Sequence, residues 1–306
     1  MRLISLILLT AIVVRALIWF WAHKGHRQIA RGIRTISTIN AIMAAYRKGD
    51  YETGLQRAEA LKDPFKPLLK TAEYCFFRGT LLHHLARLDE AEASLREGLP
   101  LEEDPRQRAL VHSTLATVLM DAGRYPEAIA FFENSSTAWP DRGSSHRGIA
   151  EVWLRQGREL AEALAQARQA VDIDRAASGM KKEALDSRLG EDLATLAWAV
   201  AANATAVFAG VDPGAVNEVE KILAESFQLC GTKTRPVLAQ IHYQAGKAYE
   251  ALKMFEKARE HFHLAAEADP RGVMGAWRTL PQCDLVSSRV SGEQAFRAER
   301  YRSRPR

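Results

Sequence analysis

The chain has 306 residues, of which 47% are hydrophobic and 26% charged, so it is long and apolar enough for a sizeable core and is not of the disordered class. Its formal net charge of +5 comes from the ends: residues 1–34 sum to +6 and residues 286–306 to +4, whereas residues 35–285 sum to −5. A groove for a phosphate backbone needs positive charge on the folded body. We therefore expect no nucleic-acid partner.

Residues 3–22 form an apolar run with one charge, Arg15. Twenty helical residues at about 1.5 Å each span about 30 Å, the thickness of a bilayer core, so we predict one transmembrane helix and a basic juxtamembrane segment up to residue 34. A cleaved signal peptide is the alternative, although no Ala-x-Ala-like site follows. More basic residues follow the run than precede it, which predicts a single-pass protein with its body on the cytoplasmic side; a periplasmic or secreted body is the alternative.

Small and bulky residues then recur at helical spacing along the chain. In the last copy, one face of the first helix carries Ala245, Gly246 and Tyr249, and one face of the second carries Ala258, Phe262 and Ala265. The turn positions Gly49, Ala86, Gly123 and Gly157 are separated by 37, 37 and 34 residues. The pattern predicts a degenerate copy near 35–67, four clear copies near 72–105, 109–140, 143–175 and 237–270, and a divergent elongated pair over 176–235, before a basic tail at 281–306.

These copies resemble tetratricopeptide repeats, which have a period of 34 residues. The resemblance implies an all-α fold in which residues 35–280 form a right-handed superhelical solenoid of antiparallel helix pairs, preceded here by one transmembrane helix. The layout of anchor and repeats is also similar to that of bacterial envelope-assembly scaffolds such as the lipopolysaccharide assembly protein B family. That family ends in a Cys-x-x-Cys pair, whereas Cys283 stands alone, so its metal site is not implied.

Chemistry-bearing motifs are absent from the sequence. It contains no phosphate-binding Gly-rich loop, no His-Glu-x-x-His and no Gly-x-Ser-x-Gly. Its three cysteines have no close spacing. His83 and His84 are adjacent on a helix and His261 and His263 are two apart, so each pair should diverge. We expect no catalytic site, cofactor or metal.

The resemblance implies a concave groove lined by the first helix of each pair. The family's Lys and Asn clamp for a terminal carboxylate is missing, because Ile39, Met43, Phe77 and Thr114 hold the corresponding places. Chaperone-tail binding is therefore disfavoured. The helix period predicts a groove that presents Phe76, Thr80, His83, Ser113, Thr117, Met120, Arg147 and Glu151.

Together these features predict a non-catalytic, membrane-tethered scaffold or adaptor that binds a protein or peptide partner in its groove, in bacterial envelope assembly. One alternative is an enzyme, or a regulatory subunit of an enzyme, whose site no motif reveals. Another is a spacer solenoid whose groove has no ligand.

Overall fold

A computed structural model of the chain describes residues 37–60, 71–179, 181–207, 212–230 and 234–269, and all regular structure in these residues is helical. The predicted transmembrane segment, the basic segment after it and the C-terminal tail lie outside the described residues. Within the described ranges, no helix is long and apolar enough to cross a bilayer. The helices are residues 37–47, α2 (Tyr51–Glu59), α3 (Thr71–His84), α4 (Leu88–Gly98), η1 (Leu99–Leu101), α5 (Pro105–Asp121), α6 (Tyr125–Ala138), α7 (Ser144–Gln156), α8 (Leu160–Ala176), α9 (Lys182–Val207), α10 (Pro213–Cys230), α11 (Arg235–Ala251) and α12 (Phe255–Ala268).

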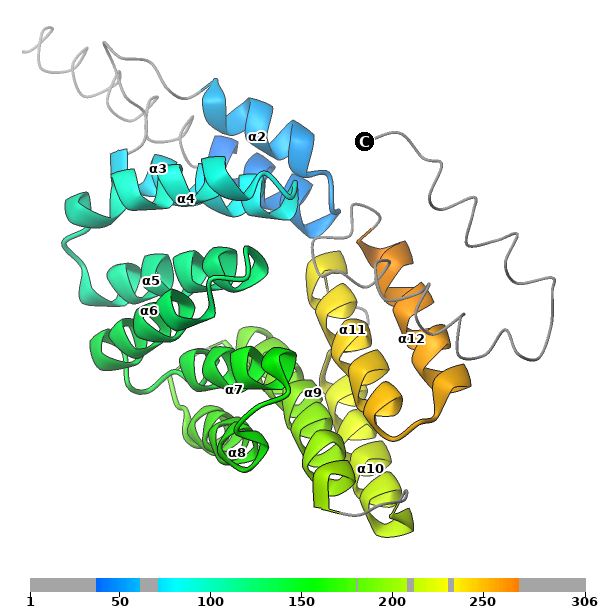
Figure 1. Cartoon of the computed structure of the whole chain (residues 1–306). Helices are drawn as coiled ribbons and strands as arrows, with labels where there is room; N and C mark the ends of the chain where they lie inside the picture. The colour runs from blue at the N-terminus through cyan, green and yellow to red at the C-terminus, as the bar shows by residue number, and fades with distance from the viewer. Residues whose placement is uncertain (1–36, 61–70, 180, 208–211, 231–233, 270–306) are drawn as a thin grey trace, which may run out of the picture.

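Short turns join successive helices into antiparallel pairs, which stack into a curved solenoid (Figure 1). In five of these pairs the turn contains a residue with positive φ, a conformation that ends a helix after its last carbonyl groups. The turn positions predicted from the sequence all have this conformation, and Lys253 has it in the last pair: Gly49, Ala86, Gly123, Gly157 and Lys253. The all-helical repeat solenoid predicted from the sequence is therefore confirmed.

Small residues let the paired helices approach closely. A Cβ atom added at Gly246 of α11 would lie 2.6 Å from the ring of Phe262 in α12. One added at Gly79 of α3 would lie 2.6 Å from Cγ of Leu95 in α4. No real Cβ contact is this short, so these places accept only glycine unless the helices separate.

The core consists of two apolar clusters that meet at α7. One runs from Ile42 to Val152 and the other from Ala150 to Ala265, and partly buried Trp153 packs against both. The core is therefore continuous along the solenoid, as stacked repeats require.

The solenoid curves until its last pair returns to its first helices (Figure 1). A Cβ atom at Gly49, just after the helix over residues 37–47, would lie 3.7 Å from Cδ of Arg235 in α11 and 3.9 Å from the carbonyl oxygen of Ala268 in α12. Tyr46 is partly buried near the same junction; desolvation raises the pKa of its phenol, and Glu191 and Asp269 raise it further. The two ends of the described solenoid therefore meet.

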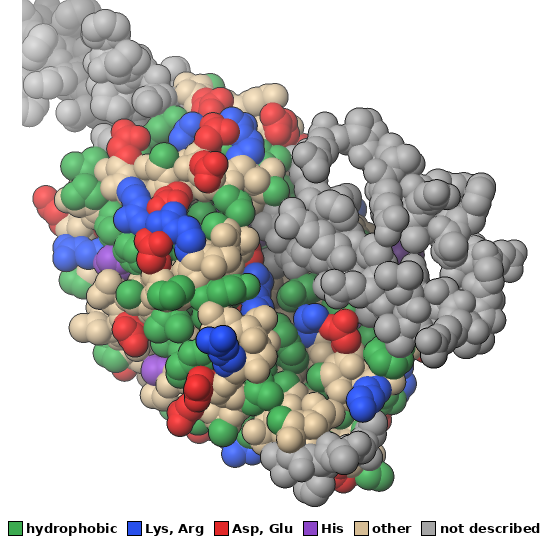
Figure 2. All heavy atoms as spheres, viewed as in Figure 1, with side chains coloured by type: hydrophobic (Ala, Val, Ile, Leu, Met, Phe, Trp, Pro, Cys, Tyr) green, Lys and Arg blue, Asp and Glu red, His purple; other side chains and the backbone are tan. Residues whose placement is uncertain are grey.

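Surface charges on the face drawn in Figure 2 are mixed in sign, with Lys and Arg side chains beside Asp and Glu side chains. Many surface charges of this chain form ion pairs, such as Arg124 Nη1 with Glu92 Oε2 at 2.6 Å and Arg124 Nη2 with Glu127 Oε2 at 2.6 Å. Exposed pairs of this kind stabilise by about 0–1 kcal/mol. They mark no binding site.

Candidate functional site

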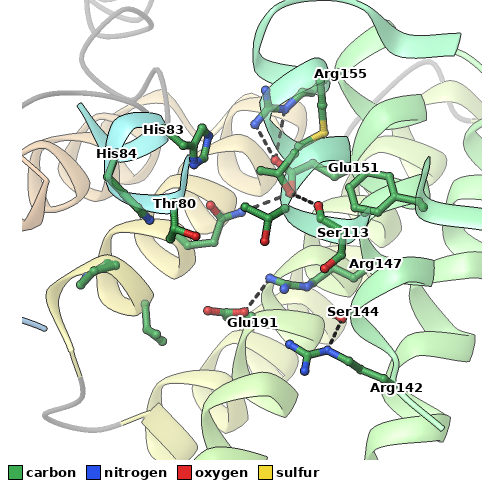
Figure 3. A pocket seen from close by; sticks show the side chains of 18 of the residues that line it. Thr80, His83, His84, Ser113, Arg142, Ser144, Arg147, Glu151, Arg155 and Glu191 are labelled. Atoms are coloured by element: carbon green, nitrogen blue, oxygen red, sulfur yellow. Dashed lines mark hydrogen bonds and ion pairs between the residues drawn. The ribbon is translucent and has the colours of Figure 1, made fainter. Parts of the chain in front are cut away.

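The concave face carries a partly open cavity of about 270 Å³, which we call the chamber. Its wall comes from residues 37–47 and from helices α3, α5, α7, α9 and α11, with two residues from α6 and the turn before α7 (Figure 3). These are mostly first helices of their pairs. Seven of the eight residues predicted for the groove line it: Thr80, His83, Ser113, Thr117, Met120, Arg147 and Glu151.

Phe76 is the predicted groove residue that does not line the chamber. It is partly buried and packs against the N-terminal apolar cluster, with its ring centroid 5.9 Å from that of Phe77. Phe76 lies one turn before Thr80, toward the start of α3 and away from the chamber. The chamber therefore begins one turn later than the sequence predicted.

Three of the lining residues belong to a buried ionic network. Nε2 of His83 lies 2.7 Å from Oδ2 of Asp121, and Nη1 of Arg155 lies 2.6 Å from Oδ1 of the same carboxylate. Nη2 of Arg155 also lies 2.7 Å from Oε1 of Glu151. Burial acts to raise the pKa of Asp121, but Arg155 and His83 outweigh it and hold that pKa below its usual value. The network therefore keeps a buried carboxylate charged while it ties α3 to α5 and α7.

The second oxygen of Glu151 faces α11. It accepts hydrogen bonds from Nε2 of Gln240 at 3.3 Å and Nε2 of Gln244 at 3.4 Å, and Gln244 Nε2 also donates to Thr195 Oγ1 of α9 at 2.6 Å. Glu151 is only 4% exposed. Its carboxylate is therefore engaged with the protein itself and holds α7 against α11.

Arg147 joins α7 to α9. Its Nη1 lies 2.7 Å from Oε2 of Glu191, and its Nε lies 3.1 Å from Oδ1 of Asp192. Asp192 and its neighbour Asp174 are fully buried. Burial raises the pKa of Asp192 well above its usual value against the opposing charge of Arg147, and Asp174 raises it further. At this part of the wall Glu191 faces the chamber. Asp192 lies behind it, and its raised pKa favours the protonated form.

An aromatic cluster closes the N-terminal end of the chamber. The hydroxyl of Tyr46 lies 3.2 Å from Nε2 of His84, whose ring stacks on Tyr51 with the centroids 4.7 Å apart. Burial and the nearby His83 together lower the pKa of His84 to about 3, so this imidazole is neutral.

The two adjacent histidines take different partners, since His83 faces Asp121 of α5 and His84 faces Tyr46. Their ring centroids are nevertheless only 5.3 Å apart and both line the chamber. The two histidines therefore bind different partners, as predicted, but they belong to the same site. In the part of the chain that the structure describes, no group of three or more His, Cys, Asp or Glu side chains is arranged to hold a metal.

Sequence reasoning missed Asp121 and Arg155, although a signal for both was present. Each lies four residues after a predicted groove residue on the same helix, Asp121 after Thr117 and Arg155 after Glu151. Extending the helix period by one turn would have found them. Arg142 also lines the chamber. It precedes α7 in a loop, where no helix period applies.

Stacked helix pairs around a concave chamber define an α-helical repeat solenoid. Two family models of the tetratricopeptide repeat match the chain, one over residues 113–179 and the other over residues 239–271. These two segments of the chain therefore match tetratricopeptide repeats. No curated protein matches it significantly in sequence.

Solved structures with this fold are similar only distantly in sequence. A Rap protein complexed with competence and sporulation factor is 12% identical, with a TM-score of 0.52 over 88% of this chain and 76% of its own. TTC0263, a tetratricopeptide-repeat protein in Thermus thermophilus, is 17% identical over 70% of this chain and 99% of its own, with a TM-score of 0.45. YrrB, described as having an unusual peptide-binding site, is 20% identical over 65% of this chain and 87% of its own, with a TM-score of 0.31. Likeness at these identities shows the fold alone.

Proposed function

We propose that this protein is a non-catalytic adaptor that binds a protein or peptide partner in the chamber and is held at a membrane by residues 3–22. Tetratricopeptide repeats generally act as scaffolds for protein partners, which supports the first half of the proposal. The chamber wall is the observation that carries it, because side chains from separate repeats converge on one cavity.

The hydroxyl groups on the wall suit an extended peptide. Thr80 Oγ1 donates to the carbonyl of Phe76 at 2.9 Å, and Thr117 Oγ1 donates to the carbonyl of Ser113 at 2.9 Å. Each hydroxyl hydrogen is therefore used, and the oxygen keeps its acceptor capacity. Backbone N–H groups of a peptide in the chamber would meet a row of such acceptors.

The membrane tether would raise the effective concentration of the chamber for partners held at the same membrane. A partner at the same membrane meets the chamber at a raised effective concentration, so a groove of micromolar intrinsic affinity suffices. The basic residues that follow the apolar run support a body on the cytoplasmic side, and a periplasmic body is the alternative. The similar layout of envelope-assembly scaffolds supports a role in bacterial envelope assembly.

Affinity capture from detergent-solubilised membranes tests the proposal. Thr117→Trp fills the chamber, whereas Thr137→Trp adds the same side chain on the exposed face of α6. We expect the first variant to lose partners that the wild type and the second retain, with the helical circular dichroism of all three unchanged. A protein without residues 1–22 should leave the membrane fraction and still capture the partners. The same partners on all three full-length proteins would contradict a role for the chamber.

A further inference from the structure

One cation on the chamber wall forms no ion pair among the residues that the structure describes. Arg147 and Arg155 both line the chamber and both pair with carboxylates. Arg142 lines the chamber too, but it forms no ion pair with any carboxylate of the described residues; its one hydrogen bond runs from Nε to Oγ of Ser144 at 2.7 Å. Its two terminal nitrogens therefore remain for a ligand.

The guanidinium of Arg142 is held in place on two sides. Beside the hydrogen bond to Ser144, its central carbon lies 5.2 Å from the ring centroid of Trp139. In Figure 3 its outer end points into the space below Arg147 and Glu191. A planar fork that is already oriented loses little entropy when it binds a second planar group.

The surroundings of Arg142 favour an added negative charge. Burial and the positive charges of Arg188 and Arg147 together lower the pKa of this guanidinium to about 10, against the opposing effect of Asp174 and Glu191. Those two carboxylates form their ion pairs with the other arginines, Asp174 with Arg188 and Glu191 with Arg147. An anion bound at Arg142 would offset the desolvation and repulsion that the two carboxylates do not cancel.

Charge favours a ligand that carries a single negative charge. Glu191 and Glu151 line the same chamber and would repel a dianion such as phosphate more strongly than a monoanion. A carboxylate on a peptide segment carries this single charge.

We propose that Arg142 binds a carboxylate of the partner, so that the ligand of the chamber is an extended peptide segment with an acidic residue. This inference rests on the proposed function and specifies its ligand. Arg142 and the carboxylate would form two parallel N–H···O bonds through the two terminal nitrogens. The position differs from the missing Lys and Asn clamp, because Arg142 lies in the turn before α7 rather than within a helix.

The test uses the full-length protein in detergent and three pools of fluorescent acetylated heptapeptide amides, with Asp, Asn or phosphoserine fixed at the centre and mixed uncharged residues elsewhere. We expect the Asp pool to bind the wild type about tenfold more tightly than the Asn pool, the effect of one charge-assisted contact. Arg142→Gln should reduce this preference to less than about twofold.

Arg106→Gln is the matched control, because Arg106 is exposed and lies 5.4 Å from the same Trp139 ring. It should keep the full preference. Arg142→Lys retains the positive charge and should keep part of the preference, and it serves as the reporter if the Gln variant does not fold.

Two results would overturn the inference. One is a wild type that binds the Asp pool no better than the Asn pool; the other is a phosphoserine pool that binds best and depends on Arg142, which would make the ligand a phosphate group. The proposed function fails separately, when Thr117→Trp captures the same partners as the wild type. If Thr117→Trp loses the captured partners while Arg142→Gln keeps them at unchanged affinity, the chamber remains the binding site, but the proposed role of Arg142 is wrong.

Discussion

The contacts inside the helix pairs and the wall of the chamber are both buried, yet they consist of opposite kinds of side chain. Ala128 and Phe132 of α6 are 0% and 2% exposed and pack among apolar residues. On the wall, Glu151 is 4% exposed and pairs with Arg155; just behind the wall, Asp192 is 0% exposed and lies against Arg147. Apolar packing tolerates small shifts, whereas a buried charge depends on one particular partner. The pairs therefore supply stability, and the wall fixes how the repeats stand relative to one another.

Removing a charge from the wall should have the largest effect. Asp121→Ala leaves His83 and Arg155 without the carboxylate they share, and breaking a buried pair costs about 3–5 kcal/mol. We expect a loss of this size in the free energy of unfolding measured with urea. Asp172→Ala, at an exposed position of α8, should cost less than about 0.5 kcal/mol. Equal losses would show that the network contributes no more than a surface charge.

Overpacking a helix pair should have the next largest effect. Ala128 is fully buried, so Ala128→Trp should lower the free energy of unfolding by about 3 kcal/mol, at the upper end for insertion into a packed core. Ala130 lies on the exposed face of the same helix, and Ala130→Trp should change the free energy of unfolding by less than about 0.5 kcal/mol. Thermal melting of the two variants measures the difference. Similar melting temperatures would mean that the pair contact is not tightly packed.

Acid should weaken the aromatic end of the chamber by a smaller amount. The pKa of His84 is about 3 in the folded protein and about 6.5 when unfolded, so protons bind the unfolded chain first and stability falls as the pH drops below about 6.5. At about pH 5 this one group costs about 2 kcal/mol relative to about pH 7.

His84→Phe keeps a ring to stack on Tyr51 and removes the titrating group. Its loss of stability between about pH 7 and about pH 5 should be smaller than that of the wild type by about 2 kcal/mol, as measured by urea unfolding at both pH values. Tyr46→Phe removes the same hydrogen bond, keeps the imidazole and should retain the pH dependence of the wild type. A variant at His84 with unchanged pH dependence would contradict the low pKa.

The same contrast explains what the sequence could predict. Contacts within a pair join two successive helices of the chain, as the contact between Gly246 and Phe262 does, and they leave a periodic pattern. Such patterns predicted the helix pairs, the turns and seven residues that line the chamber.

The closure of the solenoid brings Gly49 to Arg235, and the wall brings Glu151 to Gln244. Contacts between residues so far apart in the chain depend on the summed curvature of all the repeats, and no local sequence pattern encodes that curvature. Arg142 was missed for a related reason, because its position depends on a loop rather than on a helix face. Whether the lining residues bind a partner stays a prediction.

Hydrogen exchange of the captured complex is the most direct test of the chamber as the binding site. Comparison of the free and partner-bound protein by mass spectrometry would locate the amides that the partner protects. We predict added protection in the helices that form most of the wall, α3, α5, α7, α9 and α11, with α4, α8 and α12 unchanged. Protection confined to α4, α8 and α12 would contradict the central claim and would place the partner on the outer face of the solenoid.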